Sequence, residues 1–138
     1  MNQKNEIVNK LRSSGLRPTK QRVKLAEFLF SREKTFHFTI ENLNKIINKK
    51  GNLETISLAT IYNTIDAFTN AGHLKEILTN NNKSYFDTNI SSHHHFYDDE
   101  TNELTDVNFE EVELIKMPHA PKGKKIKGYE VIINLIKE

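Results

Sequence analysis

Apolar residues recur at spacings of three and four through the first half of the chain, which is the pattern of amphipathic helices. Turn and capping residues divide this half into four helices. Ser13-Ser14-Gly15 ends the first, and Thr19, Thr39 and Ser57 are favourable N-caps for the other three. Gly72 is expected as the C-cap of the fourth. The apolar side chains expected to face inward are Ile7, Val8, Leu11, Val23, Ala26, Leu29, Phe30, Leu43, Ile46, Ile47, Leu58, Ile61, Ile65 and Phe68.

The pattern changes after the fourth helix. Residues 73–79 and 83–86 are rich in strand-forming side chains, and they flank Asn80-Asn81-Asn82, which is a hairpin signal. Three helices, a capped fourth helix and a hairpin are the parts of a winged helix. We therefore expect an α+β protein whose N-terminal domain, residues 1–87, is a winged helix-turn-helix.

The rest of the chain, residues 88–138, predicts a small α/β domain. Neither an internal repeat nor a low-complexity linker separates it from the first. The elements expected in it are strands near 93–97, 103–107 and 126–136 and a short acidic helix at about 109–116.

Charge is divided unevenly between the two halves. Residues 1–86 carry fourteen Lys/Arg against seven Asp/Glu, whereas residues 87–138 carry six against eleven. A basic first half suits a polyanion such as nucleic acid, and an acidic second half suits a cation. The net charge of +2 conceals this asymmetry.

The chain has no cysteine. Disulfides, thiolate zinc sites and thiolate-ligated haem are therefore excluded. The first residues, MNQKNEIVNKLR, lack the apolar core of a signal peptide, and no apolar run reaches membrane-spanning length. We expect a cytoplasmic protein without a membrane partner.

The outward face of the fourth helix carries side chains suited to reading DNA. Asn63 can form two hydrogen bonds with adenine, while Ala59 and the methyl group of Thr60 can contact thymine methyls. Tyr62 can contact a thymine or donate to a phosphate. Asp66 lies on the same face and would repel phosphate. The plainer alternative is an ordinary exposed helix face.

Basic residues before and within the second helix extend this surface. Arg17 is placed to contact a phosphate or to enter a narrow A·T minor groove, and Lys20 and Arg22 would add phosphate contacts. The sequence thus predicts a double-stranded DNA ligand.

Three consecutive histidines form the other chemical signal. On a strand His93 and His95 share one face and His94 takes the other. Imidazoles beside carboxylates suit Zn, Fe(II), Mn or Co. The alternatives are a solvated strand, a metal-storage protein, or a small cupin-type metalloenzyme in which His93 and His95 act with Glu100. The helical start and the presence of only five glycines count against a cupin barrel, so we expect no enzyme.

Taken together, four segments of the chain resemble the ferric uptake regulator (Fur) superfamily. They are GLRPTKQR (15–22), SLATIYNTIDAFTNAG (57–72), KSYFD (83–87) and the histidine triplet (93–95). The resemblance implies a homodimeric winged-helix transcription regulator with a C-terminal α/β dimerisation domain. Its expected operator is an A·T-rich inverted repeat, because two-fold symmetry in the protein imposes matching symmetry on the DNA.

Within the superfamily the chain is most similar to the iron response regulator (Irr) subgroup. HHHFYDDETNEL (93–104) and KGYEVIINL (127–135) carry this likeness, as does Asn63 where ordinary Fur proteins use Arg. The family's pair of zinc-binding CxxC motifs is absent. The resemblance implies control of iron or haem homeostasis genes, and sensing of manganese, zinc or peroxide is the alternative within the family.

The same resemblance implies a regulatory site for a divalent ion of iron, manganese or zinc. It falls on His37, Asp87, His93, His95 and Asp106. Asp stands at position 87 where common members have Glu, and position 106 is also a shortened carboxylate.

A second family metal site, in the dimerisation domain, matches less well. His94 and Glu113 fall on two of its positions, but Ser92 and Tyr129 stand where it would have histidine. Irr-type proteins are also associated with haem. Without cysteine, haem would need an axial ligand from the exposed triplet of His93, His94 and His95 or from another His or Tyr, and a haem-supplying protein would then be a further partner.

Overall fold

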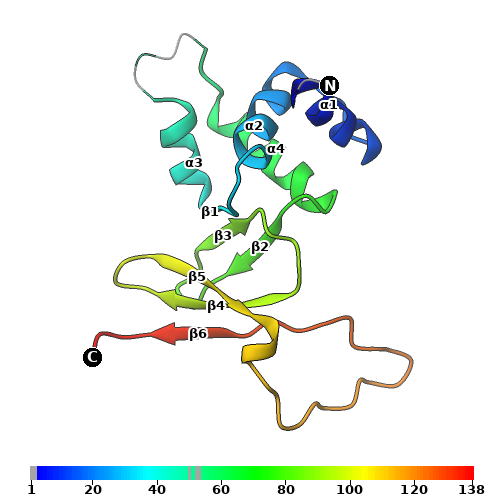
Figure 1. Cartoon of the computed structure of the whole chain (residues 1–138), viewed down its shortest axis with the longest axis vertical. Helices are drawn as coiled ribbons and strands as arrows, with labels where there is room; N and C mark the ends of the chain where they lie inside the picture. Colours follow the sequence, from blue (N-terminus) through cyan, green and yellow to red (C-terminus); the bar gives the residue numbers. More distant parts are fainter. Residues whose placement is uncertain (1–2, 50, 52–53) are drawn as a thin grey trace. The chain divides into compact units, whose positions relative to one another are not determined.

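The computed structural model describes residues 3–49, 51 and 54–138, and it divides the chain into two compact units. The first is Met1–Ile90 and the second is Ser91–Glu138, whereas the sequence placed the boundary after Asp87. Figure 1 shows helices gathered in the first unit and strands dominating the second. The predicted α+β class is confirmed, because both α-helices and β-sheets are present.

The N-terminal unit has the expected four helices and hairpin, with one additional short strand. Its elements are α1 (Gln3–Ser13), α2 (Lys20–Phe30), β1 (His37–Phe38), α3 (Ile40–Ile47), α4 (Leu58–Asn70), β2 (Lys75–Leu78) and β3 (Ser84–Asp87). The three expected N-caps are confirmed. Side-chain oxygens of Thr19, Thr39 and Ser57 each accept a hydrogen bond from the backbone N–H three residues later. Gly72 follows α4 with a φ of 86°, a conformation that glycine adopts without strain.

Helices α1 to α4 enclose the core of this unit, and most of the expected inward residues are buried. Leu58 and Ile46 are exceptions, with exposed fractions of 46% and 44%. Ile46 lies to one side of the stripe formed by Leu43 and Ile47, because each helical residue turns about 100° from the last. Leu58 is the first residue of α4 and begins the helix outside the core. The core residues are Ile7, Leu11, Val23, Leu25, Ala26, Leu29, Phe38, Ile40, Leu43, Ile47, Ile56, Ile61, Ile65, Phe68, Leu74 and Phe86.

The hairpin β2–β3 gains β1 as a third, antiparallel strand, in the order β1-β3-β2. The sequence predicts no strand before α3, because a two-residue strand such as β1 carries no periodicity. In the hairpin turn Asn82 takes a φ of 62°, which asparagine tolerates better than most residues. The pairing places His37 opposite Asp87.

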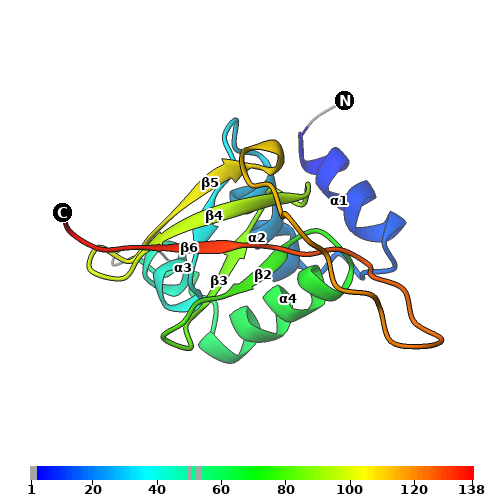
Figure 2. The ribbon, with the colours of Figure 1, turned by 90° about the horizontal axis from the view of Figure 1, so that it is seen from below.

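The C-terminal unit is built on a three-stranded sheet. It contains β4 (His93–Asp98), β5 (Glu103–Asn108) and β6 (Ile132–Leu135), with β4 in the middle. Figure 2 shows this order: β5 pairs with β4 antiparallel and β6 pairs with it parallel. The expected strands near 93–97 and 103–107 are therefore confirmed.

Two expectations for this unit were wrong in extent. The acidic helix is a single 3-10 turn, Phe109–Glu111, and the last strand covers only part of 126–136. Asn108 makes no side-chain capping bond, and the glutamates that follow repel one another at helical spacing. A long loop, drawn in orange in Figure 1, connects this turn to β6.

The second unit has a thin hydrophobic core. Among residues 91–138, all of which the structure describes, the buried hydrophobic side chains are Tyr97 and Val107. The histidine triplet is also buried, and His94 and His95 are fully enclosed. Among the described residues, no helix is both long and apolar enough to span a membrane.

Candidate metal-binding and DNA-binding residues

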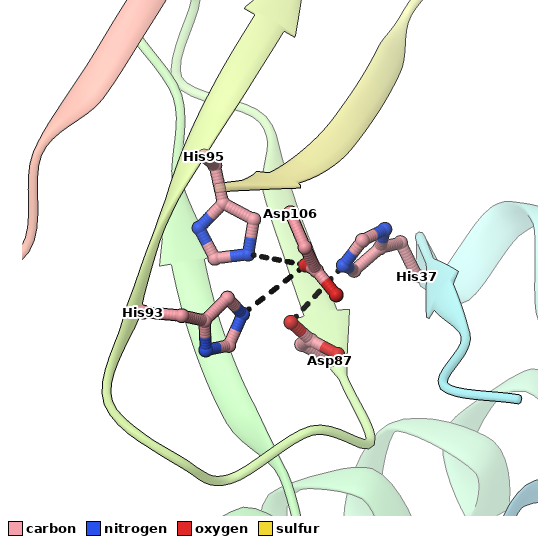
Figure 3. A group of neighbouring side chains, drawn as sticks. All are labelled: His37, Asp87, His93, His95 and Asp106. Atoms are coloured by element: carbon pink, nitrogen blue, oxygen red, sulfur yellow. Dashed lines mark hydrogen bonds and ion pairs between the residues drawn. The ribbon is translucent and has the colours of Figure 1, made fainter. Parts of the chain in front are cut away.

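The first candidate metal-binding group lies on the small sheet of the N-terminal unit. His37 and Asp87 are cross-strand partners, so their side chains lie on the same face. The Nε2 atom of His37 is 3.0 Å from Oδ2 of Asp87 (Figure 3). The other carboxylate oxygen, Oδ1, accepts a hydrogen bond from the backbone N–H of Asn89 at 2.8 Å. Asp87 is fully buried, and its carboxylate is therefore held in one orientation.

The second group lies on the sheet of the C-terminal unit. His93 and His95 project from one face of β4, as their alternation predicted, and their ring centroids are 4.4 Å apart. Both Nε2 atoms face Oδ1 of Asp106, at 3.2 Å and 3.3 Å (Figure 3). Asp106 is the cross-strand partner of His95. One ligand atom from each of these three residues lies within 4.8 Å of the others.

A backbone carbonyl orients one of these rings. The Nδ1 atom of His93 is 2.7 Å from the carbonyl oxygen of Ser91. Because a carbonyl oxygen can only accept a hydrogen bond, Nδ1 carries the proton and donates it. Metal-binding histidines characteristically donate their second ring N–H in this way, which leaves the other nitrogen for the ion. No sequence pattern could have singled out Ser91, because the contact uses its backbone carbonyl.

The donor chemistry of these two groups fits a transition metal. The first offers one imidazole and one carboxylate, and the second offers two imidazoles and one carboxylate. Nitrogen donors mixed with carboxylates suit Mn, Fe, Co or Zn, whereas Ca and Mg favour sites made of oxygen alone. The residues therefore fit the divalent ion that the sequence predicted.

His94 lies on the opposite face of β4, as expected, but the triplet is not exposed. The exposed fractions are 5% for His93 and 0% for both His94 and His95. The expectation of an exposed triplet was wrong: the His94 ring packs between Phe109 and Tyr129, and the rings of His93 and His95 pack against each other and against Asp106.

The outward face of α4 is arranged as the sequence predicted. Ala59, Tyr62, Asn63 and Asp66 are exposed, and Thr60 is half-buried near the helix N-terminus. Tyr62 is 45% exposed, and its hydroxyl lies 3.4 Å from a carboxylate oxygen of Glu41 on α3. This face is thus polar and open in the N-terminal unit.

The predicted basic residues lie near α2, partly engaged in local contacts. The guanidinium of Arg22 donates to the carbonyl of Arg17 at 3.2 Å. The ammonium of Lys20 is 2.8 Å from Glu54, and this hydrogen bond lowers the pKa of the Glu54 carboxyl. Both partners are largely exposed, so the ion pair is weak and a phosphate can compete for Lys20.

His73 has a structural environment. Its Nε2 atom is 2.7 Å from the hydroxyl of Ser14, and its ring packs against Phe30 and Phe68. Burial, and secondarily the positive charge of Lys10, lowers the pKa of His73. This histidine ties the segment before the hairpin to the turn that follows α1, and it is not part of either metal-binding group.

Comparison with known proteins identifies the family. The sequence model of the ferric uptake regulator family matches residues 13–134. The chain belongs to the ferric uptake regulator family. The family is one of regulators by its description, and the cupin alternative fails because the strands form two three-stranded sheets rather than a barrel.

Individual relatives of this Fur-family chain are distant. It is 28% identical over 111 residues to the peroxide-responsive repressor PerR of Staphylococcus epidermidis, covering 80% of this chain and 71% of that protein. Its fold matches the Pseudomonas aeruginosa ferric uptake regulator solved with manganese, with a TM-score of 0.69, 23% identity and coverage of 94% and 96%. It also matches the Francisella tularensis regulator solved with iron, with a TM-score of 0.66, 19% identity and coverage of 88% and 91%.

Proposed function

We propose that this protein is a homodimeric, DNA-binding transcription regulator, not an enzyme, whose affinity for its operator depends on a bound divalent metal ion. The observation that carries the proposal is the placement of the His and Asp donors in a Fur-family chain. His93, His95 and Asp106 converge on one sheet, and His37 and Asp87 pair on the other. A structural ion pair needs only two side chains, whereas five potential metal ligands are present here.

We propose further that both groups bind the same ion. The resemblance assigned all five residues to one regulatory site, and covalent connection supports it. Asp87 and His93 are separated by residues 88–92, which span at most about 20 Å when extended. The site would then bind a cation through three imidazole nitrogens and two carboxylates, which is a donor set for Fe(II), Mn(II) or Zn(II).

The proposed mechanism is a hinge. An ion held by His37 in the N-terminal unit and by His93 and His95 in the C-terminal unit would fix the angle between the two reading heads of the dimer, and so their match to half-site spacing. Such an ion acts only through a difference in its affinity for the two dimer shapes.

The proposed DNA contacts use the exposed face of α4 and the basic residues near α2. Asn63 would read adenine, with Ala59 and Thr60 against thymine methyls and Tyr62 against a thymine or phosphate. These preferences, together with minor-groove entry by Arg17, favour an A·T-rich inverted repeat. A second copy is favoured by the exposed hydrophobic side chains of the C-terminal unit, which are Phe109, Leu114, Ile115, Met117, Ile126, Leu135 and Ile136.

For the physiological ligand we propose iron sensing of the Irr type by direct metal binding. Haem needs an accessible axial imidazole, but His93, His94 and His95 are all buried. Haem and a haem-supplying protein are therefore the less favoured form of this proposal, because β4 would have to open to bind haem.

Peroxide sensing is the second candidate, and the similarity to PerR favours it. The two candidates separate experimentally. Hydrogen peroxide should release DNA from the Fe(II)-loaded protein and leave the Mn(II)-loaded protein bound if peroxide is the signal. If the signal is iron itself, brief peroxide exposure should leave both complexes intact.

The central test is an anaerobic DNA-binding titration of the metal-free protein. Operators are first selected from random duplexes, and anisotropy is then measured with Fe(II), Mn(II), Zn(II) and haem added separately. We expect a metal ion to change affinity at least tenfold, with haem having a smaller effect. A parent protein whose DNA affinity ignores every ligand would contradict the proposal. His37→Ala tests the hinge. If a ligand changed the DNA affinity of this variant as much as that of the parent, the hinge mechanism would be wrong, although the histidine triplet could still bind metal.

A further inference from the structure

The two faces of β4 have opposite chemical roles. His93 and His95 face Asp106, whereas His94 faces two aromatic rings. The His94 ring stacks on Phe109, with centroids 5.0 Å apart and planes at 19°, and on Tyr129, at 5.5 Å and 25°. Phe109 and Tyr129 also contact one another, at 5.4 Å. His94 is thus one member of an aromatic cluster.

Hydrogen bonding fixes the proton on the His94 ring. The backbone N–H of Val131 donates to Nδ1 of His94 at 2.9 Å, so Nδ1 must carry a lone pair. A neutral imidazole has one donor nitrogen and one acceptor nitrogen, and its proton is therefore on Nε2. Within the described part of the chain, this fully buried Nε2 has no hydrogen-bond partner.

A metal ion needs the opposite arrangement. It binds a nitrogen lone pair, and the second nitrogen of a ligating histidine donates its N–H to an acceptor. His93 follows that rule, because its Nδ1 donates to the carbonyl of Ser91 and its Nε2 faces Asp106. For His94 to bind an ion through Nε2 while accepting from Val131, the ring would have to lose its only remaining proton.

We infer that the second family metal site is absent, and that each protomer binds one ion through β4. In its place the chain has a hydrogen-bonded aromatic cluster that holds the segment before β6 against β4. Tyr129, which stands where the family would have histidine, closes this cluster by stacking. The count of one ion rests on the proposed metal site, whereas the exclusion of His94 as a ligand rests only on its own contacts.

Metal stoichiometry tests the count. The full-length protein is equilibrated with excess Co(II) or Zn(II), dialysed, and its metal content is measured for the parent, His94→Phe and His93→Ala. The Phe variant preserves the aromatic ring and removes both nitrogens. We expect one ion per protomer for the parent and for His94→Phe, and less than half an ion for His93→Ala. Two ions in the parent, with one lost in His94→Phe, would overturn the inference.

The tautomer provides an independent measurement on the unsubstituted protein. Long-range ¹H–¹⁵N spectra should show His94 protonated at Nε2, both before and after Zn(II) is added. Loss of that Nε2 proton on Zn(II) addition would establish His94 as a ligand and refute the inference. A parent that binds no ion but retains the Nε2 tautomer would refute the proposed metal site and the one-ion count, while upholding the exclusion of His94.

Discussion

Asp106→Asn should remove most of the metal-dependent stability of this protein. Asp106 supplies the carboxylate of the C-terminal group, and its Oδ1 atom lies 3.2 Å and 3.3 Å from the two Nε2 atoms of His93 and His95. Asparagine preserves the size of the side chain but removes its charge. Losing a residue that merely orients a ligand weakens metal binding about 10–100-fold. We therefore expect the loss of this carboxylate to weaken binding about 100-fold.

This loss converts directly into unfolding free energy. At a free metal concentration about 100 times the parent dissociation constant, binding stabilises the native state by about 2.7 kcal/mol. At the same metal concentration, a 100-fold weaker variant gains only about 0.4 kcal/mol, because its site is half occupied. The variant should therefore lose about 2 kcal/mol of metal-induced stabilisation.

Urea unfolding with buffered Mn(II), and again with chelator, measures both increments at one protein concentration. Asp99→Asn is the matched control, since Asp99 is exposed and the substitution removes the same charge from the same unit. The control should keep the parent increment. If Asp106→Asn kept it as well, Asp106 would not be a ligand, and the assignment of the second group would fail.

Further predictions concern DNA reading, packing and pH. Asn63→Ala should cost about 1–3 kcal/mol of binding free energy at the preferred operator and relax base preference. Arg17→Ala should instead weaken binding to all sequences and lower the slope of log affinity against log salt concentration by about one. If both variants bound the operator like the parent, the assigned reading face would be wrong. Asn48→Ala should destabilise the N-terminal unit by about 2–3 kcal/mol, measured by urea unfolding. The Asn48 side chain exchanges two hydrogen bonds of 2.6 Å and 2.7 Å with the backbone of Ile56, which hold the end of α3 to the segment before α4, and it donates a third to Asn44 within α3. The pKa of His73 is lower in the folded protein than in the unfolded chain, so the unfolded chain binds a proton first as the pH falls. The contribution of His73 to the free energy of unfolding is therefore fully present above the unfolded pKa near 6.5 and declines below it. His73→Gln should show a smaller loss of stability between pH 7.5 and 5.5 than the parent, and an equal loss would exclude this contribution.

Much of the fold followed from local signals in the sequence. Thr19, Thr39 and Ser57 begin helices because their side-chain oxygens satisfy backbone donors that no helix can satisfy internally. The placement of His93 and His95 on one face followed from the two-residue repeat of a strand. These features depend on residues close together in the chain, and a sequence displays them directly.

Other features depended on contacts between distant residues. The pairing of His37 with Asp87 requires β1, which is too short to show a pattern. The stacking of Tyr129 on His94 joins positions far apart in the sequence, and no spacing rule predicts it. The resemblance to the Fur family supplied the candidate ligands, but it could not show which nitrogen of His94 carries a proton.

The thin core of the C-terminal unit has a consequence for any measurement made on this protein. With Tyr97 and Val107 as its buried hydrophobic side chains, this unit has too little enclosed apolar surface to be stable by itself. A partner that covers its exposed apolar residues would supply the missing burial, so assembly and folding would be a single equilibrium. Mass action then makes the apparent stability a property of the solution as well as of the chain: unfolding midpoints should rise with protein concentration. In a cell, the amount of protein made would help to decide how much of it is folded and able to respond.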